Sequence, residues 1–164
     1  MRSSTCASSA PDTVTGTLLR RATATDLETL LPLVEAFCAI DEHPYDETRV
    51  RRALGPLLAD DSHGVVWLIG DPPGGYAVLT WSYSLESGGR DALLDEIFLR
   101  ERGQGLGSAA LPSIHDDLRD RGITRIFLET EEHNARARRF YARNGFVVEP
   151  STWMAADLQP GEQA

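Results

Sequence analysis

A glycine-rich segment, RGQGLG, stands between an apolar run, LLDEIFL, and a stretch with helical spacing. Glycines where a strand turns into a helix let backbone N–H groups approach an anion without interference from a Cβ atom. The N-terminus of the following helix adds about half a positive charge and N–H donors that have no partner in the helix. We interpret this segment as a candidate pyrophosphate site, with a tight turn as the alternative; its residues are Arg102, Gly103, Gln104, Gly105, Leu106, Gly107 and Ser108.

Two familiar phosphate-binding loops do not match this segment. A P-loop needs Gly-Lys-Ser/Thr, and no lysine follows Gly105 or Gly107. The dinucleotide fingerprint needs a further glycine three residues after the second one, where this chain has Ser108 or Ala110. The spacing therefore excludes a P-loop hydrolase and disfavours a dinucleotide-dependent oxidoreductase.

A second segment, NARARRFYARNGF, is also typical of a helix followed by a strand. Asn134, Ala137, Tyr141 and Asn144 follow one another at intervals of three or four residues, so they share one helix face. Tyr141 then lies near the end of that helix, just before a glycine. From the residues alone, Tyr141 is either a packing aromatic or a functional phenol.

Together these segments resemble the GNAT superfamily of N-acetyltransferases. Arg102, Gly105 and Gly107 are similar to the family's motif for the pyrophosphate of acetyl-CoA, Arg/Gln-x-x-Gly-x-Gly/Ala. The segment from Asn134 is similar to the family's next motif and lies at the expected distance. The opening, LLRRATATDLETLLPLV, resembles the usual first strand and helix, and the whole resemblance covers about residues 17–158.

The resemblance implies an enzyme that takes an acetyl group from acetyl-CoA. The pantetheine arm of the donor would lie along residues 94–99, where that strand splays from the strand at residues 126–129. Backbone N–H groups near Ile97 or Phe98 would polarise the thioester carbonyl, and Tyr141 would return a proton to the leaving thiolate. Asn134 would contact the pantetheine amides. Besides residues 102–108, the implied donor-binding residues are Ile97, Phe98, Leu99, Asn134, Ala137 and Tyr141.

The resemblance also implies that an amine attacks the thioester directly, so an ammonium group with a pKa of about 10 must lose a proton. Asp95 and Glu96 lie in an otherwise apolar run and are our candidates for the base or for a substrate anchor. Polyamine-transferring and small-amine members of the family use a similar pair. Adjacent strand residues point to opposite faces, so we expect at most one carboxylate at the thioester and the other in a salt bridge. Alternation does not choose between them, because this strand often carries a bulge in the family.

The acceptor is expected to meet a loop that is rich in carboxylates and aromatics. In GNAT folds the loop between the first two helices borders the acceptor site, and aromatics end a neighbouring strand here. Carboxylates with aromatic faces suit an ammonium group through charge and cation–π attraction. A polyamine, a lysine side chain and an amino-sugar remain open as acceptors, and a merely solvated acidic loop is the alternative. The candidate residues are Asp41, Glu42, Tyr45, Trp81 and Tyr83.

The elements that must position these residues follow from periodicity and breakers. We expect strands at residues 17–22, 65–69, 76–83, 92–99, 123–129, 146–149 and 153–158, and helices at 23–40, 48–59, 105–121 and 134–144. This order predicts an α+β, three-layer fold with a mixed central sheet of about seven strands and helices on both faces. Residues 1–16 are expected to form a disordered tail before a single domain at residues 17–164.

Composition narrows the function class further. With a net charge of −9, the chain is unsuited to non-specific binding of nucleic acid or anionic membrane. No apolar run reaches the roughly 20 residues that a membrane helix needs, and the two cysteines, one of them a structural thiol at Cys38, suggest a cytoplasmic protein. His43, His63, His115 and His133 have no metal-ligand spacing, so no metal is expected. Family habit suggests a possible homodimer.

Two readings compete with the enzyme. A non-catalytic module could bind acyl-CoA as a sensor, although the presence of Asp95, Glu96 and Tyr141 counts against it. A dinucleotide oxidoreductase is disfavoured by the glycine spacing. The sequence therefore favours an N-acetyltransferase that acts on a primary amine.

Overall fold

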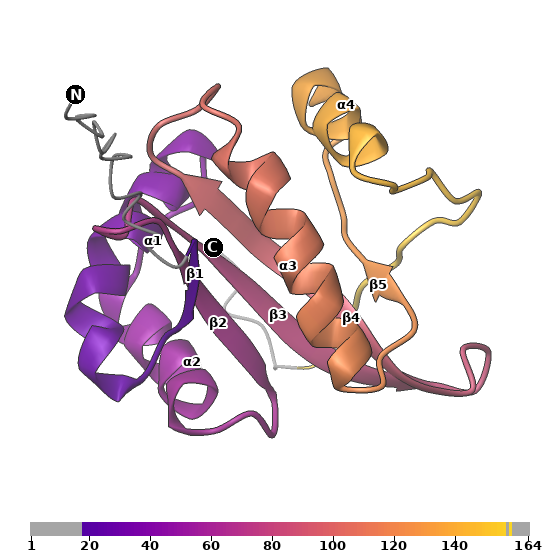
Figure 1. Ribbon diagram of the computed structural model, residues 1–164, viewed down its shortest axis with the longest axis horizontal. Coiled ribbons are helices and arrows are strands. Elements are labelled where there is room, and N and C mark those ends of the chain that lie inside the picture. Colours follow the sequence, from indigo (N-terminus) through magenta and orange to yellow (C-terminus); the bar gives the residue numbers. More distant parts are fainter. Residues whose placement is uncertain (1–17, 157, 159–164) are drawn as a thin grey trace, which may run out of the picture. The chain divides into compact units, whose positions relative to one another are not determined.

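The computed structural model describes residues 18–156 and 158, and the chain divides into two units, residues 1–129 and 130–164. The first, which we call the sheet unit, contains β1 (Leu19–Arg21), a 3-10 turn η1 (Ala24–Asp26), α1 (Leu27–Ile40), α2 (Glu47–Ala59), β2 (Gly64–Ile69), β3 (Gly75–Ser84), β4 (Gly89–Leu99), α3 (Leu106–Asp120) and β5 (Ile126–Phe127) (Figure 1). The second, the C-terminal unit, contains α4 (Ala135–Arg143).

The strands of the sheet unit form one sheet in the order β1-β2-β3-β4-β5. The pairs β1–β2, β2–β3 and β3–β4 are antiparallel. The last pair, β4–β5, is parallel, and α3 makes the crossover between its two strands. A mixed sheet with parallel pairing only across a helix is the arrangement that the sequence predicted.

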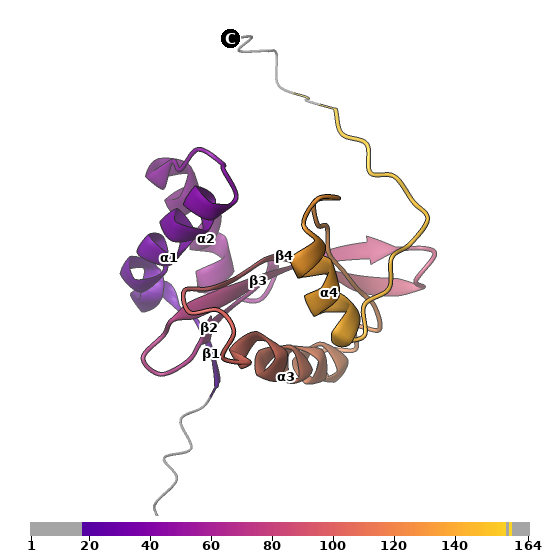
Figure 2. The same cartoon turned by 90° about the horizontal axis from the view of Figure 1, so that it is seen from above.

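Helices cover the two faces of this sheet: α1 and α2 lie over one face and α3 over the other (Figure 2). The face under α1 and α2 buries aliphatic residues of both helices against residues of β2, β3 and β4, among them Val66, Tyr76, Val78 and Phe98. On the opposite side, α3 buries Ala110, Leu111, Ile114 and Leu118. The prediction of helices on both faces is therefore confirmed.

Side-chain hydrogen bonds hold the turn η1 that leads into α1 and cap the start of α2. The Asp26 carboxylate accepts from the Thr23 backbone N–H at 2.8 Å and is gripped by the Arg20 guanidinium at 2.7 and 2.9 Å. That ion pair lowers the pKa of the nearly buried Asp26 carboxyl, despite the opposing effect of burial. At α2, the Asp46 side chain accepts from the Arg49 N–H at 3.1 Å. The Asp26 carboxylate thus completes a capping box at η1, and that of Asp46 satisfies a donor that the first turn of α2 leaves open.

The prediction of about seven strands was wrong by two, because residues 146–149 and 153–156 form no strand. A strand needs a hydrogen-bonded partner, and Pro150 limits the first of these runs to four residues after Gly145. Val147 and Val148 are accordingly 82% and 85% exposed. The expected strand at 123–129 also shrinks to the two residues of β5.

Other boundaries differ from prediction by a few residues at most. The pair Gly55-Pro56 lies inside α2 and does not end the helix. The predicted tail at residues 1–16, together with Thr17 and Asp157, falls outside the described residues. No helix among the residues that the structure describes is long and apolar enough to cross a membrane.

Candidate active site

The pairing between β3 and β4 slips by one residue at Asp95. Val78 pairs with Glu96, but the next residue of β3, Leu79, pairs with Leu94. Asp95 is therefore the extra residue of a β-bulge, which shifts the side-chain alternation of β4 by one position. From this point on, residues of β4 face the side opposite to the one that strict alternation would give.

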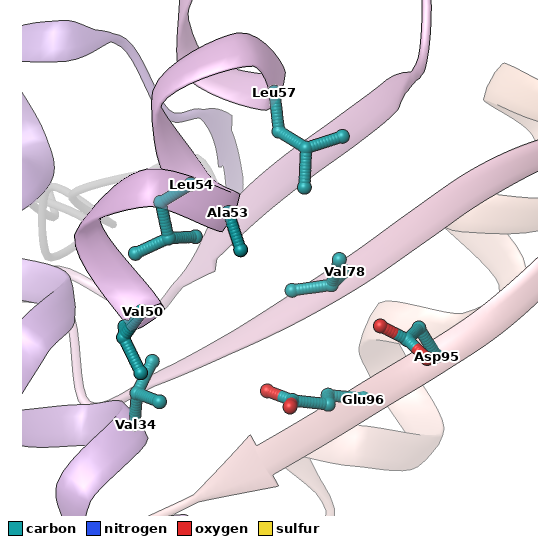
Figure 3. Close-up of a pocket in the computed structure, with 8 residues that line it drawn as sticks. All are labelled: Val34, Val50, Ala53, Leu54, Leu57, Val78, Asp95 and Glu96. Carbon is teal, nitrogen blue, oxygen red and sulfur yellow. The ribbon is translucent and has the colours of Figure 1, made fainter. Parts of the chain in front are cut away.

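The bulge brings both candidate carboxylates to the same face of the sheet. Asp95 and Glu96 project from β4 toward α1 and α2 and line one pocket of about 100 Å³ (Figure 3). The premise that Asp95 and Glu96 point to opposite faces of the sheet was therefore wrong. The reason is the bulge, because strict alternation holds only while the register is regular.

No ion pair within residues 18–156 and 158 involves either carboxylate. Burial against the apolar pocket raises the pKa of Asp95, even though part of this side chain is exposed. Burial likewise raises the pKa of Glu96, and the charges of Asp95 and Asp41 add to the effect. Two carboxylates that hold protons more tightly than usual are suited to accept a proton near neutral pH.

Tyr76 holds one of the two carboxylates in place. Its hydroxyl donates to Glu96 Oε2 at 2.6 Å, and the Tyr76 side chain is fully buried between β3 and the helices above it. This hydrogen bond lowers the pKa of Glu96 and so opposes the larger effect of burial. Burial first, and the Glu96 charge second, raise the pKa of the Tyr76 phenol, which therefore remains a donor.

Sequence reasoning missed Tyr76, which reads as an ordinary β-strand aromatic. The contact could have been predicted from the pairing of β3 with β4. Tyr76 pairs with Phe98, so Glu96, two residues before Phe98, is the diagonal neighbour of Tyr76 on the same face. That relation is hidden until the strand pairing is known.

The loop between α1 and α2 borders Glu96. Asp41 raises the pKa of Glu96 and His43 lowers it, so both lie within electrostatic reach of that carboxylate. The His43 Nδ1 atom is 3.5 Å from Asp41 Oδ2. Tyr45 packs partly buried against the core under α1 and α2, and Glu42 is exposed with a left-handed backbone, φ 57°. The loop that was predicted to meet the acceptor thus lies beside the carboxylate pair.

Trp81 and Tyr83 lie elsewhere. The Trp81 indole N–H donates to the Asp61 carbonyl at 2.8 Å, and the Arg121 guanidinium lies 5.5 Å from the centre of its ring. Arg121 is the C-cap of α3, so Trp81 faces the side of the sheet opposite the pocket. Tyr83 is two residues further along β3 and is 78% exposed. The structure does not bring these two aromatics to the carboxylates, because β3 turns their side chains to the α3 face.

Among residues 18–156 and 158, the edge of β4 that faces away from β3 has no strand partner after Leu93, and we call this stretch the open edge. β5 pairs with β4 only at Ala92 and Leu93. The Arg100 N–H donates to the Gly74 carbonyl at 2.9 Å, and successive N–H groups of a strand point to opposite edges. The N–H groups of Ile97 and Leu99 therefore point to the open edge, whereas that of the buried Phe98 points toward β3. Of the two predicted oxyanion donors, this geometry favours Ile97.

The glycine-rich segment forms the turn from β4 into α3. Gly103 and Gly105 both have left-handed backbone conformations, φ 90° and 78°, and Gly105 is the residue that caps α3. A Cβ atom added at either position would meet no atom of a non-adjacent described residue within 4 Å. There is room for an anion beside these glycines, above the first-turn N–H groups from Leu106 to Ser108, which have no acceptor within the helix.

The polar side chains of this segment lie at the surface. Arg102 and Gln104 are exposed, and the Gln104 amide donates to Glu101 at 2.5 Å. Gly107 is buried in the first turn of α3. The expected strand–glycine turn–helix context of the motif is therefore present.

In the C-terminal unit, α4 carries the second motif. Asn134 is its N-cap, with the side-chain oxygen accepting from the Ala137 N–H at 3.0 Å. Tyr141 lies between Phe140 and Phe146, with ring centroids 5.1 and 5.5 Å away. Burial raises the pKa of Tyr141 to about 12, so the phenol stays protonated at physiological pH.

Among the described residues, no group of three histidine, cysteine or acidic side chains is arranged to hold a metal ion. Cys38, expected to be a structural thiol, is free and buried under α1 and α2.

The raised pKa of Glu96 predicts how stability depends on pH. The folded state holds this proton more tightly than the unfolded chain, so the free energy of unfolding falls as pH rises from the ordinary glutamate pKa through the raised one. Glu96→Gln removes this penalty and keeps an acceptor for Tyr76. Its melting temperature should therefore exceed that of the wild type at pH 7.5, and the difference should shrink at pH 4.

The matched control is Glu35→Gln, an exposed position on α1. Thermal unfolding across this pH range should leave the control parallel to the wild type. A Glu96→Gln protein that melts below the wild type at pH 7.5 would show that the ionised carboxylate stabilises the fold.

Comparison with known proteins agrees with this geometry. The model of the acetyltransferase (GNAT) family matches residues 30–146. A structure from Arthrobacter sp. FB24, solved as a proposed acetyltransferase, is 31% identical over 90% of this chain and 99% of its own, with a TM-score of 0.78. An integron cassette protein from the mobile metagenome of Cole Harbour Salt Marsh is 30% identical over 88% of this chain and 92% of its own, with a TM-score of 0.77.

A more distant structure has the same fold. It is an aminoglycoside acetyltransferase from an uncultured soil metagenomic sample, solved with sisomicin, and is 15% identical over 86% of this chain and 95% of its own, with a TM-score of 0.69. None of the curated proteins matches the chain. From its matched motifs, its sheet order and these relatives, we conclude that the chain belongs to the acetyltransferase (GNAT) family.

Proposed function

We propose that the chain transfers an acetyl group from acetyl-CoA to a primary amine, by direct attack of the amine on the thioester. The acceptor classes considered are a polyamine-like molecule, an amino-sugar and a lysine side chain. The observation that carries the proposal is the bulge in β4. It sets two carboxylates with raised pKa values in one pocket, next to the open strand edge where the N–H of Ile97 points outward.

The residues present fit acetyl-CoA as the donor. The open edge of β4 offers the backbone groups of Ile97 and Leu99 to the amides of the pantetheine arm. The open space at Gly103 and Gly105 would let the pyrophosphate approach the N-terminus of α3. Arg102, the residue before Gly103, would add a positive charge beside the phosphates. Asn134, Ala137 and Tyr141 of α4 remain proposed donor contacts from the family motif.

The carboxylate pair would handle the proton of the acceptor. An amine arrives as an ammonium ion, which the pair attracts, and it becomes a nucleophile only after losing a proton. Because Tyr76 occupies one oxygen of Glu96, we propose that Glu96 mainly orients the ammonium and that Asp95 takes the proton. The N–H of Ile97 would stabilise the negative charge that develops on the carbonyl oxygen during attack.

Tyr141 would complete the reaction by donating its proton to the leaving thiolate. A phenol with a pKa of about 12 is protonated throughout the working pH range, so the proton is available when the C–S bond breaks. The thiolate of CoA, a thiol with an ordinary pKa of about 8.5, would otherwise leave as an anion.

The competing reading is a sensor that binds acyl-CoA without turnover. Release of free thiol from acetyl-CoA in the presence of a panel of amines separates the two, because a sensor binds the donor but releases no thiol. Amino-sugars belong in that panel, since a relative with the same fold is an aminoglycoside acetyltransferase.

The first prediction of this mechanism concerns the glycine turn. Gly105→Val should weaken CoA binding by at least about tenfold, or ~1.4 kcal/mol, because the side chain fills the space that the phosphates need. Gly122→Val is the matched control: Gly122 follows the other end of α3, with φ 74° and similar open space. Calorimetry with CoA, alongside thermal unfolding, measures both effects.

Both substitutions place a side chain in a left-handed conformation, so both should lose a similar amount of stability, about 1–2 kcal/mol. Equal CoA affinity in the two folded variants would show that this turn does not bind the pyrophosphate.

The second prediction concerns the base. In the wild type, kcat/KM should level off above the pKa of the carboxylate pair. In Asp95→Asn the rate should be lower and keep rising toward about pH 10, because the amine must then lose its proton to solvent. Glu96→Gln should also lower the rate, and the double variant should lose less than the sum of the two free-energy changes, since the groups share one pocket.

Asp116→Asn, on the exposed face of α3, is the matched control for amidation. If both pocket variants keep the pH profile of the wild type, the proton leaves by another route.

The third prediction concerns the acid. Tyr141→Phe should lower turnover by about 10²-fold or more, the usual scale for a lost proton donor, while CoA affinity stays within about twofold. Steady-state kinetics and calorimetry together make the measurement. Full activity in this variant would make Tyr141 a packing residue between Phe140 and Phe146.

A further inference from the structure

The pocket beside the carboxylates has two chemically different walls. One wall is the bulge in β4, with Asp95 and Glu96. The other is entirely aliphatic and comes from α1, α2 and β3, as Figure 3 shows: Val34, Val50, Ala53, Leu54, Leu57 and Val78. A pocket of this kind selects both for a charge at one end and for an apolar body at the other.

The aliphatic wall disfavours a hydroxylated acceptor. No side chain that lines the pocket carries a nitrogen or oxygen atom except the two carboxylates. The hydroxyl groups of an amino-sugar would lose hydrogen bonds to water here and find few partners in return. Methylene groups, in contrast, gain free energy from contact with such a wall.

The carboxylates disfavour an acyl chain in the same space. Neither is neutralised by an ion pair within the described residues. A fatty acyl tail would bury these groups further without offering a hydrogen bond or a positive charge. An ammonium group supplies both, so the charge complement of this pocket is a cation with a hydrocarbon tail.

We propose that the acceptor is a primary amine on an unbranched aliphatic chain, with its ammonium group between Asp95 and Glu96 and its chain against α1 and α2. This inference rests on the proposed function and narrows its acceptor class from three possibilities to linear alkylamines, including diamines and the side chain of lysine. Amino-sugars are expected to be poor acceptors.

A homologous series of amines tests the assignment. Thiol release is measured with ethylamine, n-propylamine, n-butylamine and n-hexylamine, and with glucosamine as the hydroxylated amine. Each added methylene should raise kcat/KM by roughly fourfold, which corresponds to about 0.8 kcal/mol, until the chain fills the pocket. Glucosamine should be at least about tenfold poorer than n-butylamine. The sequence contains no lysine, so acetylation of lysine side chains of the enzyme itself cannot contribute to the thiol released without an added amine.

A matched pair of substitutions tests the aliphatic wall. Ala53 lines the pocket and is exposed, so leucine can be introduced there without displacing core residues. Ala53→Leu should lower kcat/KM for n-hexylamine at least tenfold and for ethylamine by less than threefold. Ala59→Leu makes the same change at the exposed end of α2, outside the pocket, and should leave both values within twofold of the wild type.

Three results would overturn the assignment. These are a rate that is independent of chain length, a preference for glucosamine, and an Ala53→Leu variant that changes selectivity among acetyl-, butyryl- and hexanoyl-CoA instead of among amines. The last result would mean that the pocket receives the acyl group.

Calorimetry with n-butylamine in the absence of acetyl-CoA separates this inference from the proposed function. Alkylamine binding that Ala53→Leu abolishes, in a protein that releases no thiol with any amine, would support the pocket assignment and overturn the transferase. Thiol release without chain-length preference would do the reverse.

Discussion

A strand presents two consecutive side chains to the same face only where its pairing slips by a residue, and β4 slips at Asp95. Without the slip, Asp95 or Glu96 would face α3 and the pocket would hold a single carboxylate. The bulge at Asp95 lies two residues after Leu93, the last residue of β4 that pairs with β5. The acidic pocket and the stretch of β4 that has no partner in β5 therefore lie next to each other along the same strand.

Ionised carboxylates in this pocket are expected to lower the stability of the fold. Both carboxylates are partly desolvated, neither has an ion-pair partner among the described residues, and the raised pKa values record the unfavourable free energy of ionising them there. A core chosen for stability alone would have apolar residues at these positions, like the neighbouring Val78 and Phe98. The fully buried Tyr76 hydroxyl donates to Glu96 and so offsets part of the cost of ionising this carboxyl group. Local conflict of this kind is expected where a site needs reactive groups.

Sequence reasoning succeeded where local signals decide the structure. Glycine spacing and helical periodicity predicted the turn from β4 into α3, and the breakers placed the helices within a few residues of their observed ends. It failed where pairing decides. Three features depend on the register, that is, on which residues of two strands lie opposite each other. They are the face to which Trp81 points, the bulge at Asp95 and the contact of Tyr76 with Glu96. The sequence of a single strand does not determine that register. The two missing strands failed for the same reason, since apolar runs become strands only when a partner edge is available.

Along β4, backbone groups are proposed to bind the donor, whereas side chains are proposed to bind the acceptor. Backbone groups at the open edge and the turn after Leu99 are proposed to hold the donor, and they depend little on side-chain identity. The wall opposite the carboxylates consists of side chains of α1 and α2, and Ala53 is exposed to solvent beside the pocket. Substitutions on these two helices can therefore reshape the pocket without disturbing the strand that carries Asp95 and Glu96. We therefore expect members of this fold that use different acceptors to differ in α2 and to keep the bulge in β4, because only the bulge keeps both carboxylates on the face that we propose binds the acceptor.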